Sequence, residues 1–403
     1  MNILEEIQNC PVEWKELGEV CSVKKGKQLN KNLLTEDGLY PAYNGGQTYS
    51  GRTNDYNVEA NTIIVSQGGA SAGFVNFVDT KFWANAHCYY ILSDETRVNN
   101  RFVYHFVKMN QKYLMDFQHG AGIPALKADK LSKLLLPIPP LEIQEKIVQI
   151  LDKFTDYVTE LTSELTSRKK QYSFYRDKLL SFEDEVYQVE WKTLGEVAEC
   201  LAGATPRTSN SSYWENGTIP WMSSGEVSKG FVYDTEKKIT QEGYDSCSTK
   251  VVPRDTVVIA LAGQGKTRGT VAITKVELCT NQSLCSIVSN DDINSHYLYY
   301  YLKGQYQKLR DISSGEGTRG GLNLKMIRDF RIPVPSLKIQ SRIVQVLDNF
   351  DMVCNDLNIG LPKEIELRQK QYEYFREKLL TFTAEGVYTD STVQYSTVQT
   401  RPH

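Results

Sequence analysis

Pro137–Leu151 reads PIPPLEIQEKIVQIL, and Pro333–Leu347 reads PVPSLKIQSRIVQVL. Each stretch joins a Pro-x-Pro segment, which a helix cannot contain, to the start of an apolar pattern of helical period. The same order of segments therefore occurs twice, and the repeat has the size of a domain. The 403 residues are predicted to hold two copies of one unit, in contrast to the short repeats of a solenoid.

Other duplicated segments lie at both ends of each copy. Val12–Val20 (VEWKELGEV) returns as Val189–Val197 (VEWKTLGEV), and Lys170–Phe182 (KQYSFYRDKLLSF) returns as Lys370–Phe382 (KQYEYFREKLLTF). Aromatic and leucine residues at three-to-four spacing predict helical pieces, and short β-branched runs between Gly, Asn and Ser predict strands. The helical pieces are Leu92–Leu114 and Asn294–Leu309, and the strands are Thr62–Ser66, Phe74–Val78, Thr256–Ala260 and Thr270–Thr274.

A long helix is predicted after each Pro-x-Pro segment. Apolar residues follow heptad spacing for about five heptads in each copy, and the second copy contains a stutter of four extra residues. Gly360 and Pro362 indicate a bend or break in that second helix. Neither helix can bury its apolar stripe alone, so we expect the two to form an antiparallel coiled coil. Two helices that each fold back on their own globule are the alternative.

These patterns predict an α+β fold class. We expect two similar mixed α/β globular domains, separated by a pair of long antiparallel coiled-coil helices with pseudo-two-fold symmetry. The expected boundaries are an N-terminal segment at 1–13, a first globule at 14–140, a central helix at 141–185, a second globule at 186–336, a distal helix at 337–383 and a poorly ordered tail at 384–403.

Composition excludes several classes of function. A net charge of −3 and a pI near 6.1 argue against a free-standing nucleic-acid binder, so a site for a polyanion requires a local basic patch or a partner. The absence of a long apolar run predicts a cytoplasmic protein. The eight cysteines form no C-x-x-C pair, which predicts buried apolar residues in place of a zinc site.

No catalytic centre is predicted. Ala260–Thr267 (ALAGQGKT) fits a permissive phosphate-loop pattern, but a strand is predicted where a phosphate loop requires a helix. The five histidines have no counterparts in the other copy, whereas a duplicated catalytic domain should carry its catalytic residues twice. We therefore predict no catalytic, cofactor-binding or metal-binding residues. If the Ala260–Thr267 pattern did bind phosphate, the chain would be an ATP-dependent enzyme, and this is the alternative function.

Two segments of the second copy resemble a known family. Thr205–Ser224 (TPRTSNSSYWENGTIPWMSS) is similar to the signature of target recognition domains in the specificity subunit of Type I restriction–modification enzymes. Thr318–Val344 resembles the matching exit signature, in which a TR-x-x-L-N stretch leads through I-P-x-P-x-L-x-x-Q into the conserved helix. The first copy departs from this pattern, with Tyr40–Gly51 (YPAYNGGQTYSG) in the first block and Ile123 in place of the Thr-Arg element. The resemblance covers residues 12–382.

This resemblance implies a non-catalytic DNA reader. Each globule would read one half of a bipartite, asymmetric target in double-stranded DNA, and the helices would set the spacer and dock two modification subunits. S-adenosylmethionine, ATP and Mg²⁺ would be bound by the modification (methyltransferase) and restriction (translocase and nuclease) subunits, and none by this chain. An assembly scaffold that does not read DNA is the alternative.

Candidate DNA contacts are basic and polar residues in Gly-rich loops, because amides and guanidinium groups read bases and cations bind phosphates. In the first copy they are Lys24, Lys25, Lys27, Gln28, Lys31, Tyr43, Asn44, Arg52 and Gln67. In the second copy they are Thr205, Arg207, Ser209, Ser223, Ser224, Lys266, Arg268 and Arg319. Subunit docking is assigned to the helical seam, at Ile147, Leu151, Phe154, Tyr172, Ile343, Leu347, Phe350 and Tyr372. The core is expected to contain Trp83, Trp214 and Trp221.

Overall fold

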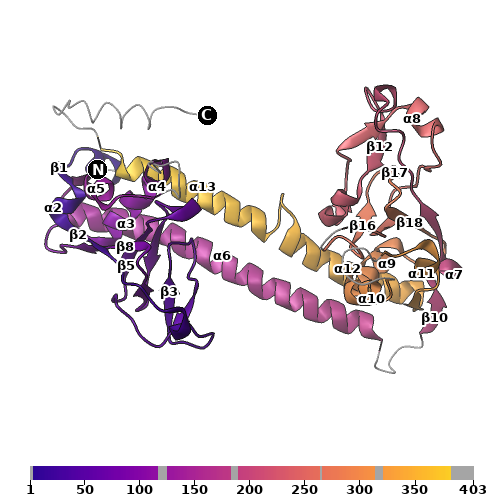
Figure 1. Ribbon diagram of the computed structural model, residues 1–403, viewed down its shortest axis with the longest axis horizontal. Helices are drawn as coiled ribbons and strands as arrows, with labels where there is room; N and C mark the ends of the chain where they lie inside the picture. The colour runs from indigo at the N-terminus through magenta and orange to yellow at the C-terminus, as the bar shows by residue number, and fades with distance from the viewer. Residues whose placement is uncertain (1–2, 117–124, 183–188, 264–265, 314–320, 383–403) are drawn as a thin grey trace. The chain divides into compact units, whose positions relative to one another are not determined.

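A computed structural model of the chain describes residues 3–116, 125–182, 189–263, 266–313 and 321–382. The chain forms two compact units (Figure 1). Unit 1 contains Met1–Thr162 and Glu364–His403, and unit 2 contains Ser163–Lys363. Each unit therefore holds one globule, the helix half adjoining it in sequence, and a helix half from the other copy.

The described residues of the unit 1 globule form three antiparallel or mixed sheets. The largest has the strand order β2-β8-β5-β6, the second has the order β4-β3-β7, and the third is the pair β1-β9, in which Trp14 lies opposite Pro137. The pair β1-β9 places the start of the globule beside the beginning of the long helix. The elements are α1 (Ile3–Gln8), β1 (Glu13–Glu16), α2 (Leu17–Val20), β2 (Cys21–Lys25), η1 (Lys31–Leu33), β3 (Tyr40–Tyr43), β4 (Gly51–Thr53), β5 (Thr62–Ser66), η2 (Gly69–Ser71), β6 (Val75–Val78), β7 (Trp83–Ala84), β8 (Cys88–Ser93), α3 (Asn100–Met109), α4 (Gln111–Asp116), α5 (Ala128–Ser132) and β9 (Leu135–Ile138).

The globule of unit 2 repeats this topology with one added strand. Its sheets have the orders β11-β18-β15-β16-β13, β14-β12-β17 and β10-β19, and Trp191 lies opposite Pro333 in the last. The added strand β13 pairs in parallel with β16. The elements are β10 (Glu190–Thr193), α7 (Leu194–Val197), β11 (Ala198–Ala202), η3 (Ser211–Tyr213), β12 (Ile219–Met222), η4 (Ser224–Lys229), β13 (Phe231–Val232), β14 (Lys237–Ile239), α8 (Gln241–Asp245), β15 (Val257–Ala260), β16 (Val271–Thr274), β17 (Cys279–Thr280), β18 (Leu284–Ser289), α9 (Ser295–Gly304), α10 (Tyr306–Asp311), α11 (Leu324–Arg328) and β19 (Arg331–Val334).

The long helices of the described part of the chain are α6 (Leu141–Ser181), α12 (Leu337–Asn355) and α13 (Leu361–Leu380). In unit 1, Phe154 of α6 stacks on Phe375 of α13 at a ring-centroid distance of 5.2 Å. The last turn of α13, with Leu379 and Leu380, lies in the same core as Ile143 at the start of α6, so the two segments are antiparallel.

Unit 2 contains the same helix contact with the copies exchanged. Tyr175 of α6 stacks on Phe350 of α12 at 5.8 Å, and Leu180 shares a core with Ile343 and Leu347. Each globule is thus covered by a helix half from the other copy. The predicted fold class is confirmed, and the alternative in which each helix folds back on its own globule is wrong.

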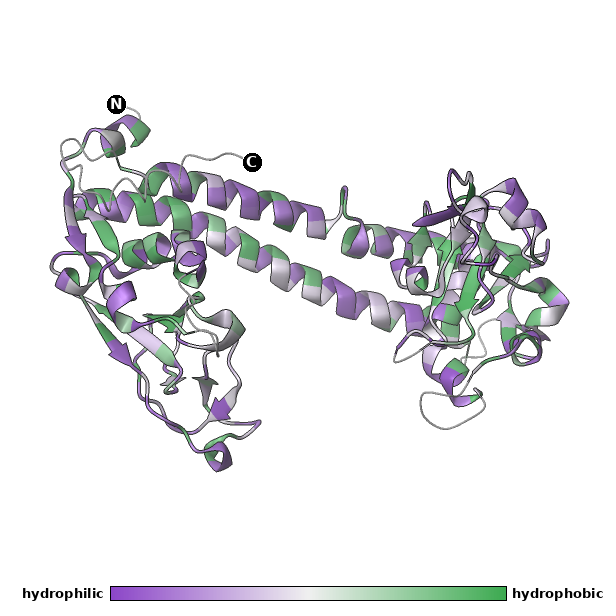
Figure 2. Cartoon of the chain, turned by 45° about the horizontal axis from the view of Figure 1, so that its top comes forward, coloured by the Kyte–Doolittle hydropathy of each residue, from purple (hydrophilic) through white to green (hydrophobic). Residues whose placement is uncertain are grey.

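The interiors follow the apolar strands that the sequence predicts. In Figure 2 the hydrophobic residues gather on the central strands of the second globule, while the long helices alternate between hydrophobic and hydrophilic residues. All four residues of β15 and of β16 are buried. Trp221 is buried, as predicted, with Trp214 packed edge-on against it at 5.0 Å, whereas Trp83 is only half-buried.

Two predicted helical segments differ from the structure. Leu92 belongs to β8, and the helical part of Leu92–Leu114 begins only at Asn100, because Asn99 caps α3 with its side chain. The distal helix at 337–383 is two helices, with 356–360 between α12 and α13. Gly360 marks this break, as predicted, because a Cβ there would lie 2.5 Å from the Met352 carbonyl oxygen. Pro362 lies in the first turn of α13, where its missing N–H has no cost.

The terminal segments give two further results. The predicted N-terminal segment contains α1, whose Ile7 is buried in the core of unit 1 and whose Glu6 pairs with Lys146 of α6 at 2.6 Å. The predicted tail at 384–403 lies outside the described residues. No helix among the described residues is long and apolar enough to cross a membrane.

Candidate nucleic-acid interface

The loops with the predicted DNA contacts meet at one turn in each unit. In unit 1 this turn is Asn85–His87, just before β8, and in unit 2 it is Asn281–Ser283, just before β18. The Cys88 N–H donates to the Asn85 carbonyl at 3.0 Å, and the Leu284 N–H donates to the Asn281 carbonyl at 3.1 Å. We refer to these two segments as the matched turns.

Backbone hydrogen bonds connect each matched turn to the same neighbouring segments. In both units these segments are the residues after the first strand of the globule, the end of the strand in the smaller sheet and the residue after the central strand. In unit 1 the bonds are Gly26 N to Cys88 O (2.9 Å), Lys27 N to Ala84 O (2.9 Å), Asn85 N to Tyr43 O (2.9 Å) and Gln67 N to His87 O (2.8 Å). In unit 2 they are Gly203 N to Leu284 O (3.3 Å), Ala204 N to Thr280 O (3.0 Å), Asn281 N to Met222 O (3.1 Å) and Leu261 N to Ser283 O (2.8 Å).

Glycine is required at the closest approach in both units. A Cβ on Gly26 would lie 2.2 Å from the Asn85 carbonyl oxygen, and a Cβ on Gly203 would lie 2.2 Å from the Thr280 carbonyl oxygen. Backbone therefore packs directly on backbone at this point. The two units therefore have the same backbone arrangement at this point, although the side chains on it differ.

In unit 1, the structure brings several predicted residues to the matched turn. Asn44 and Gln67 directly follow β3 and β5, and Lys27 is the second residue after β2; Lys27 and Asn44 are exposed. Lys24 and Lys25 are exposed on β2, and Lys31 is exposed in η1. The four lysines are thus exposed within a short segment of a chain whose net charge is negative.

Three predicted contacts in unit 1 have internal partners. Arg52 donates to the carbonyls of Gly38 (2.6 Å) and Leu39 (2.8 Å), so it holds its own loop. Gln28 donates to the Leu29 carbonyl at 3.1 Å, and the Tyr43 ring packs on Phe82 at 5.6 Å. These contacts give the three side chains structural roles.

In unit 2, Thr205 is the predicted residue that touches the matched turn, because its hydroxyl donates to Oε1 of Gln282. Arg207 and Ser209 are exposed on the loop that follows. Ser223 caps η4 through Glu226 at 3.1 Å, which gives it a structural role, and Ser224 is half-buried at the start of η4.

The hairpin between β15 and β16 carries two further predicted residues of unit 2, Lys266 and Arg268. Lys266 is exposed, and its carbonyl accepts from the Tyr306 hydroxyl at 2.9 Å, which fixes the hairpin to α10. Arg268 is buried, so it is removed from the expected surface. Residues 271–274 form β16, so the strand predicted after the phosphate-loop pattern is confirmed. Arg319 lies outside the described residues.

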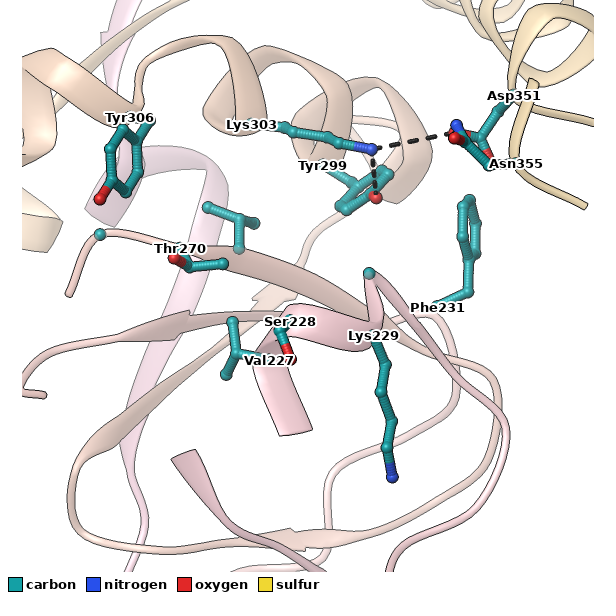
Figure 3. Close-up of a pocket in the computed structure, with 13 residues that line it drawn as sticks. Val227, Ser228, Lys229, Phe231, Thr270, Tyr299, Lys303, Tyr306, Asp351 and Asn355 are labelled. Atoms are coloured by element: carbon teal, nitrogen blue, oxygen red, sulfur yellow. Dashed lines mark hydrogen bonds and ion pairs between the residues drawn. The ribbon is translucent and has the colours of Figure 1, made fainter. Parts of the chain in front are cut away.

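A hollow of about 390 Å³ lies beyond this hairpin in unit 2 (Figure 3). Lys303 lies beside it, 3.0 Å from the Tyr299 hydroxyl and 3.8 Å from Asp351. In unit 1 the corresponding Lys108 lies 4.4 Å from the Phe74 ring, at the position of Thr270. The two globules therefore differ in the side chains around an equivalent strand pair.

The eight seam residues assigned to subunit docking lie inside the chain's own cores. Ile147, Leu151 and Leu347 are fully buried, and Tyr172, Ile343 and Tyr372 are at most 6% exposed. Phe154 and Phe350 pack against the same cores. Their burial contradicts direct docking, because a heptad seam covered by the chain's own second helix is not available to a partner. The apolar residues that remain exposed on the helices include Tyr157, Phe174, Val353, Leu367 and Tyr374.

A buried glutamine joins each globule to its helix. Gln144 accepts from the Asn99 N–H at 2.7 Å and donates to the Pro139 carbonyl at 2.8 Å. Gln340 makes the same bonds to Asn294 (2.7 Å) and Pro335 (2.8 Å). Both belong to the duplicated Pro-x-Pro segment, so duplication was the signal that could have identified them from the sequence.

A cluster of polar residues lies beside this junction in unit 1. Arg101 and His105 of α3 both contact Asp152 of α6, and His105 Nδ1 lies 3.0 Å from the Tyr372 hydroxyl of α13. Burial lowers the pKa of His105, against the opposing hydrogen bond to Asp152. Burial alone would raise the pKa of Asp152, but the bonds from His105 and Arg101 lower it. Among the described residues, no group of three His, Cys, Asp or Glu side chains could hold a metal ion.

Comparisons with known proteins agree with this architecture. The family described as "Type I restriction modification DNA specificity domain" matches residues 11–168 and 188–367. The specificity subunit of the type I restriction enzyme EcoR124I/EcoR124II of Escherichia coli is 33% identical over 402 residues, covering 95% of this chain and 97% of that protein.

Two solved structures share the fold. The crystal structure of a Type I restriction–modification S subunit from M. genitalium has a TM-score of 0.65 at 22% identity, covering 93% of this chain and 98% of that one. A chain from a study of complex assembly and conformational transition in the type I R-M system has a TM-score of 0.57 at 18% identity, covering 92% and 98%. The chain belongs to the Type I restriction–modification DNA specificity family, with one specificity domain in each copy of its repeat.

Proposed function

We propose that the chain is the DNA-reading subunit of a Type I restriction–modification complex, in which unit 1 and unit 2 each read one half of a bipartite, asymmetric target. The observation that carries this proposal is the matched turn. The same backbone scaffold occurs twice with different surface side chains, which suits two related but distinct ligands. A specificity subunit recognises its target and leaves the chemistry to other subunits.

The charge distribution supports a composite DNA site. Exposed lysines on β2 and in the loop after it, together with Lys266 in unit 2, can bind phosphates, while the net charge of the chain is −3. DNA would therefore be enclosed by this chain and its partners together. S-adenosylmethionine, ATP and Mg²⁺ would be bound by those partners, and the assembly would act on DNA in the cytoplasm.

Two methyltransferase subunits would dock on the outer faces of the helices. Phe174 and Tyr374 occupy equivalent positions in the repeated KQY segments, and they are 61% and 53% exposed. Tyr157 and Val353 form a second exposed pair at equivalent positions. Each unit therefore presents one apolar residue of each pair, which suits two copies of one partner. Replacing Phe174 with Asp should reduce the bound methyltransferase subunits from two to one in native mass spectrometry, and an unchanged count of two would contradict this docking face.

A selection experiment tests the proposed function. The chain, in complex with its methyltransferase subunits, is incubated with a duplex DNA library of random sequence, and the bound DNA is sequenced. The expected result is two short defined blocks of different sequence at a fixed separation, absent when the methyltransferase subunits are used alone. Enrichment of no sequence would favour the assembly scaffold without DNA reading.

A further inference from the structure

We infer that the exposed residues of the matched turns, Gln282 in the second position of the unit 2 turn and His87 in the third position of the unit 1 turn, determine the base preference of each half-site. The inference rests on the proposed function, since it requires that both globules read DNA. It concerns two side chains that no loop motif in the sequence identifies.

The backbone of each matched turn is held on both sides. The N–H groups of Asn85 and Cys88 donate within the scaffold, and the His87 carbonyl accepts from Gln67. Asn281, Leu284 and Ser283 make the corresponding bonds in unit 2. The strand that follows is central in each sheet, since β8 lies between β2 and β5, and β18 lies between β11 and β15. A side chain on such a turn is presented from a rigid base, as direct base reading requires.

The sequences of the turns diverge only where the side chains reach solvent. The first residue is asparagine in both, whereas the next two are Ala86-His87 in unit 1 and Gln282-Ser283 in unit 2. His87 and Gln282 are exposed. The adjoining positions also differ, with Lys27 against Ala204. A shared scaffold with different exposed groups is what two different half-sites require.

The chemistry of Gln282 favours adenine. A glutamine amide can accept from adenine N6 and donate to adenine N7 in the major groove. The Thr205 hydroxyl donates to Oε1 of Gln282 and orients the amide, and this oxygen retains a second lone pair. The unit 2 half-site should therefore contain an adenine read by Gln282. The imidazole of His87 can donate a hydrogen bond to the acceptor edge of guanine.

The experiment measures the methylated motif in cells that carry the chain with its methyltransferase partners. Gln282→Ala should relax the preference at one adenine position of one half-site by about ten- to a hundred-fold, since a good bidentate pair contributes a discrimination of that size. The other half-site and the spacer should not change. His87→Ala should relax one position in the opposite half-site.

Two controls keep the outcomes separate. Gln307→Ala removes an exposed glutamine from α10 of the same unit and should leave the motif intact, and melting curves should show that all variants are folded. A bipartite wild-type motif that Gln282→Ala and His87→Ala both leave unchanged would overturn this inference while the proposed function stands. A base preference that weakens equally at every position of the motif would also overturn the inference, because that result is expected of a side chain that contacts a phosphate and not a base. A wild-type complex without a motif would overturn the proposed function itself.

Discussion

Unit 1 and unit 2 have different side chains at the equivalent position between globule and helices. In unit 1, Arg101 and His105 surround Asp152, and His105 also meets Tyr372 of α13. In unit 2, the Tyr300 hydroxyl donates to Asp348 at 2.6 Å, and His296 lies 3.5 Å from the same carboxylate. The Tyr172 hydroxyl, which corresponds to that of Tyr372, is buried without a hydrogen-bond partner among the described residues.

The difference shows which features the architecture requires. Both units retain the capping asparagine, the junction glutamine, the carboxylate on the helix and the tyrosine from the other copy. Arg101 and His105 of unit 1 do not recur, because the equivalent positions of unit 2 hold His296 and Tyr300. The four repeated side chains join each globule to two helices, whereas the contacts of Arg101 and His105 stabilise unit 1 alone.

The largest expected effect comes from removing the second copy altogether. A fragment of residues 1–188 contains the globule of unit 1 and all of α6, so its helix has no partner. The segment around Tyr172 and Tyr175 repeats the one around Tyr372 and Phe375, so two fragments should pair as a closed antiparallel dimer.

With methyltransferase partners, this dimer should recognise an interrupted palindrome built from the unit 1 half-site. Sedimentation at micromolar concentration checks the dimer, and the methylated motif checks its specificity. A folded monomer would contradict the exchange of helix halves between the copies, since it would leave a five-heptad apolar seam exposed.

The next largest expected effect is a loss of stability on replacing the junction glutamine, and it should be equal in the two units. Gln144→Ala and Gln340→Ala each leave a buried N–H and a buried carbonyl without partners, and each should destabilise its unit by about 2–4 kcal/mol. Hydrogen exchange should show loss of protection in α3 for the first variant and in α9 for the second. Gln149→Ala and Gln345→Ala, at exposed equivalent positions on α6 and α12, are the matched controls. Loss of protection in both units from one variant would contradict two separately stabilised globules.

A smaller effect distinguishes the units. Tyr372→Phe removes the hydroxyl that meets His105 in a buried site and should cost about 1–2 kcal/mol. Tyr172→Phe removes a buried hydroxyl without a partner among the described residues, so it should be neutral or stabilise by up to about 1 kcal/mol. Denaturant unfolding of both variants measures the contrast. Equal losses would mean that the two tyrosines have equivalent partners.

The smallest effect is a pH dependence confined to unit 1. Because the folded state lowers the pKa of His105, its contribution to stability is present above the unfolded pKa of about 6.5 and is lost as pH falls through the folded value. Asp152 also has a lowered pKa and acts in the same direction at more acidic pH, while Arg101 and Arg376 oppose protonation of the imidazole. The protection of α3 amides, expressed relative to their intrinsic exchange rates at each pH, should decrease as pH falls from 7.5 to 5.5, and His105→Gln should flatten this decrease. The control His87→Gln removes an exposed histidine and should leave the decrease in protection as it is in the wild type.

Much of the fold could be predicted because the repeat identifies its own elements. The strand predicted at Thr62–Ser66 is β5 at those residues, and the heptad seam at Ile147 and Leu347 is buried between helices. The seam pattern identifies apolar residues but does not distinguish a chain's own helix from a partner as their cover. Docking was therefore assigned to the buried residues, although Phe174 and Tyr374 on the outer face remain exposed.

The candidate site was harder to predict, because it depends on hydrogen bonds between loops that are distant in sequence. Thr205 and Gln282 are 77 residues apart and meet only in the folded unit. Arg52 and Ser223 have the composition of DNA contacts, yet their side chains are bound to their own loops. Composition predicts which residues can contact DNA, but the partners that a folded loop supplies decide which of them are free to do so.

The central claim is that each unit reads one half of the target independently. The most direct measurement replaces residues 209–224 of unit 2 with the corresponding segment of another specificity subunit and determines the methylated motif in cells with the methyltransferase partners. The account predicts that one half-site changes while the other half-site and the spacer stay the same. A motif that changes in both halves, or in neither, would contradict it.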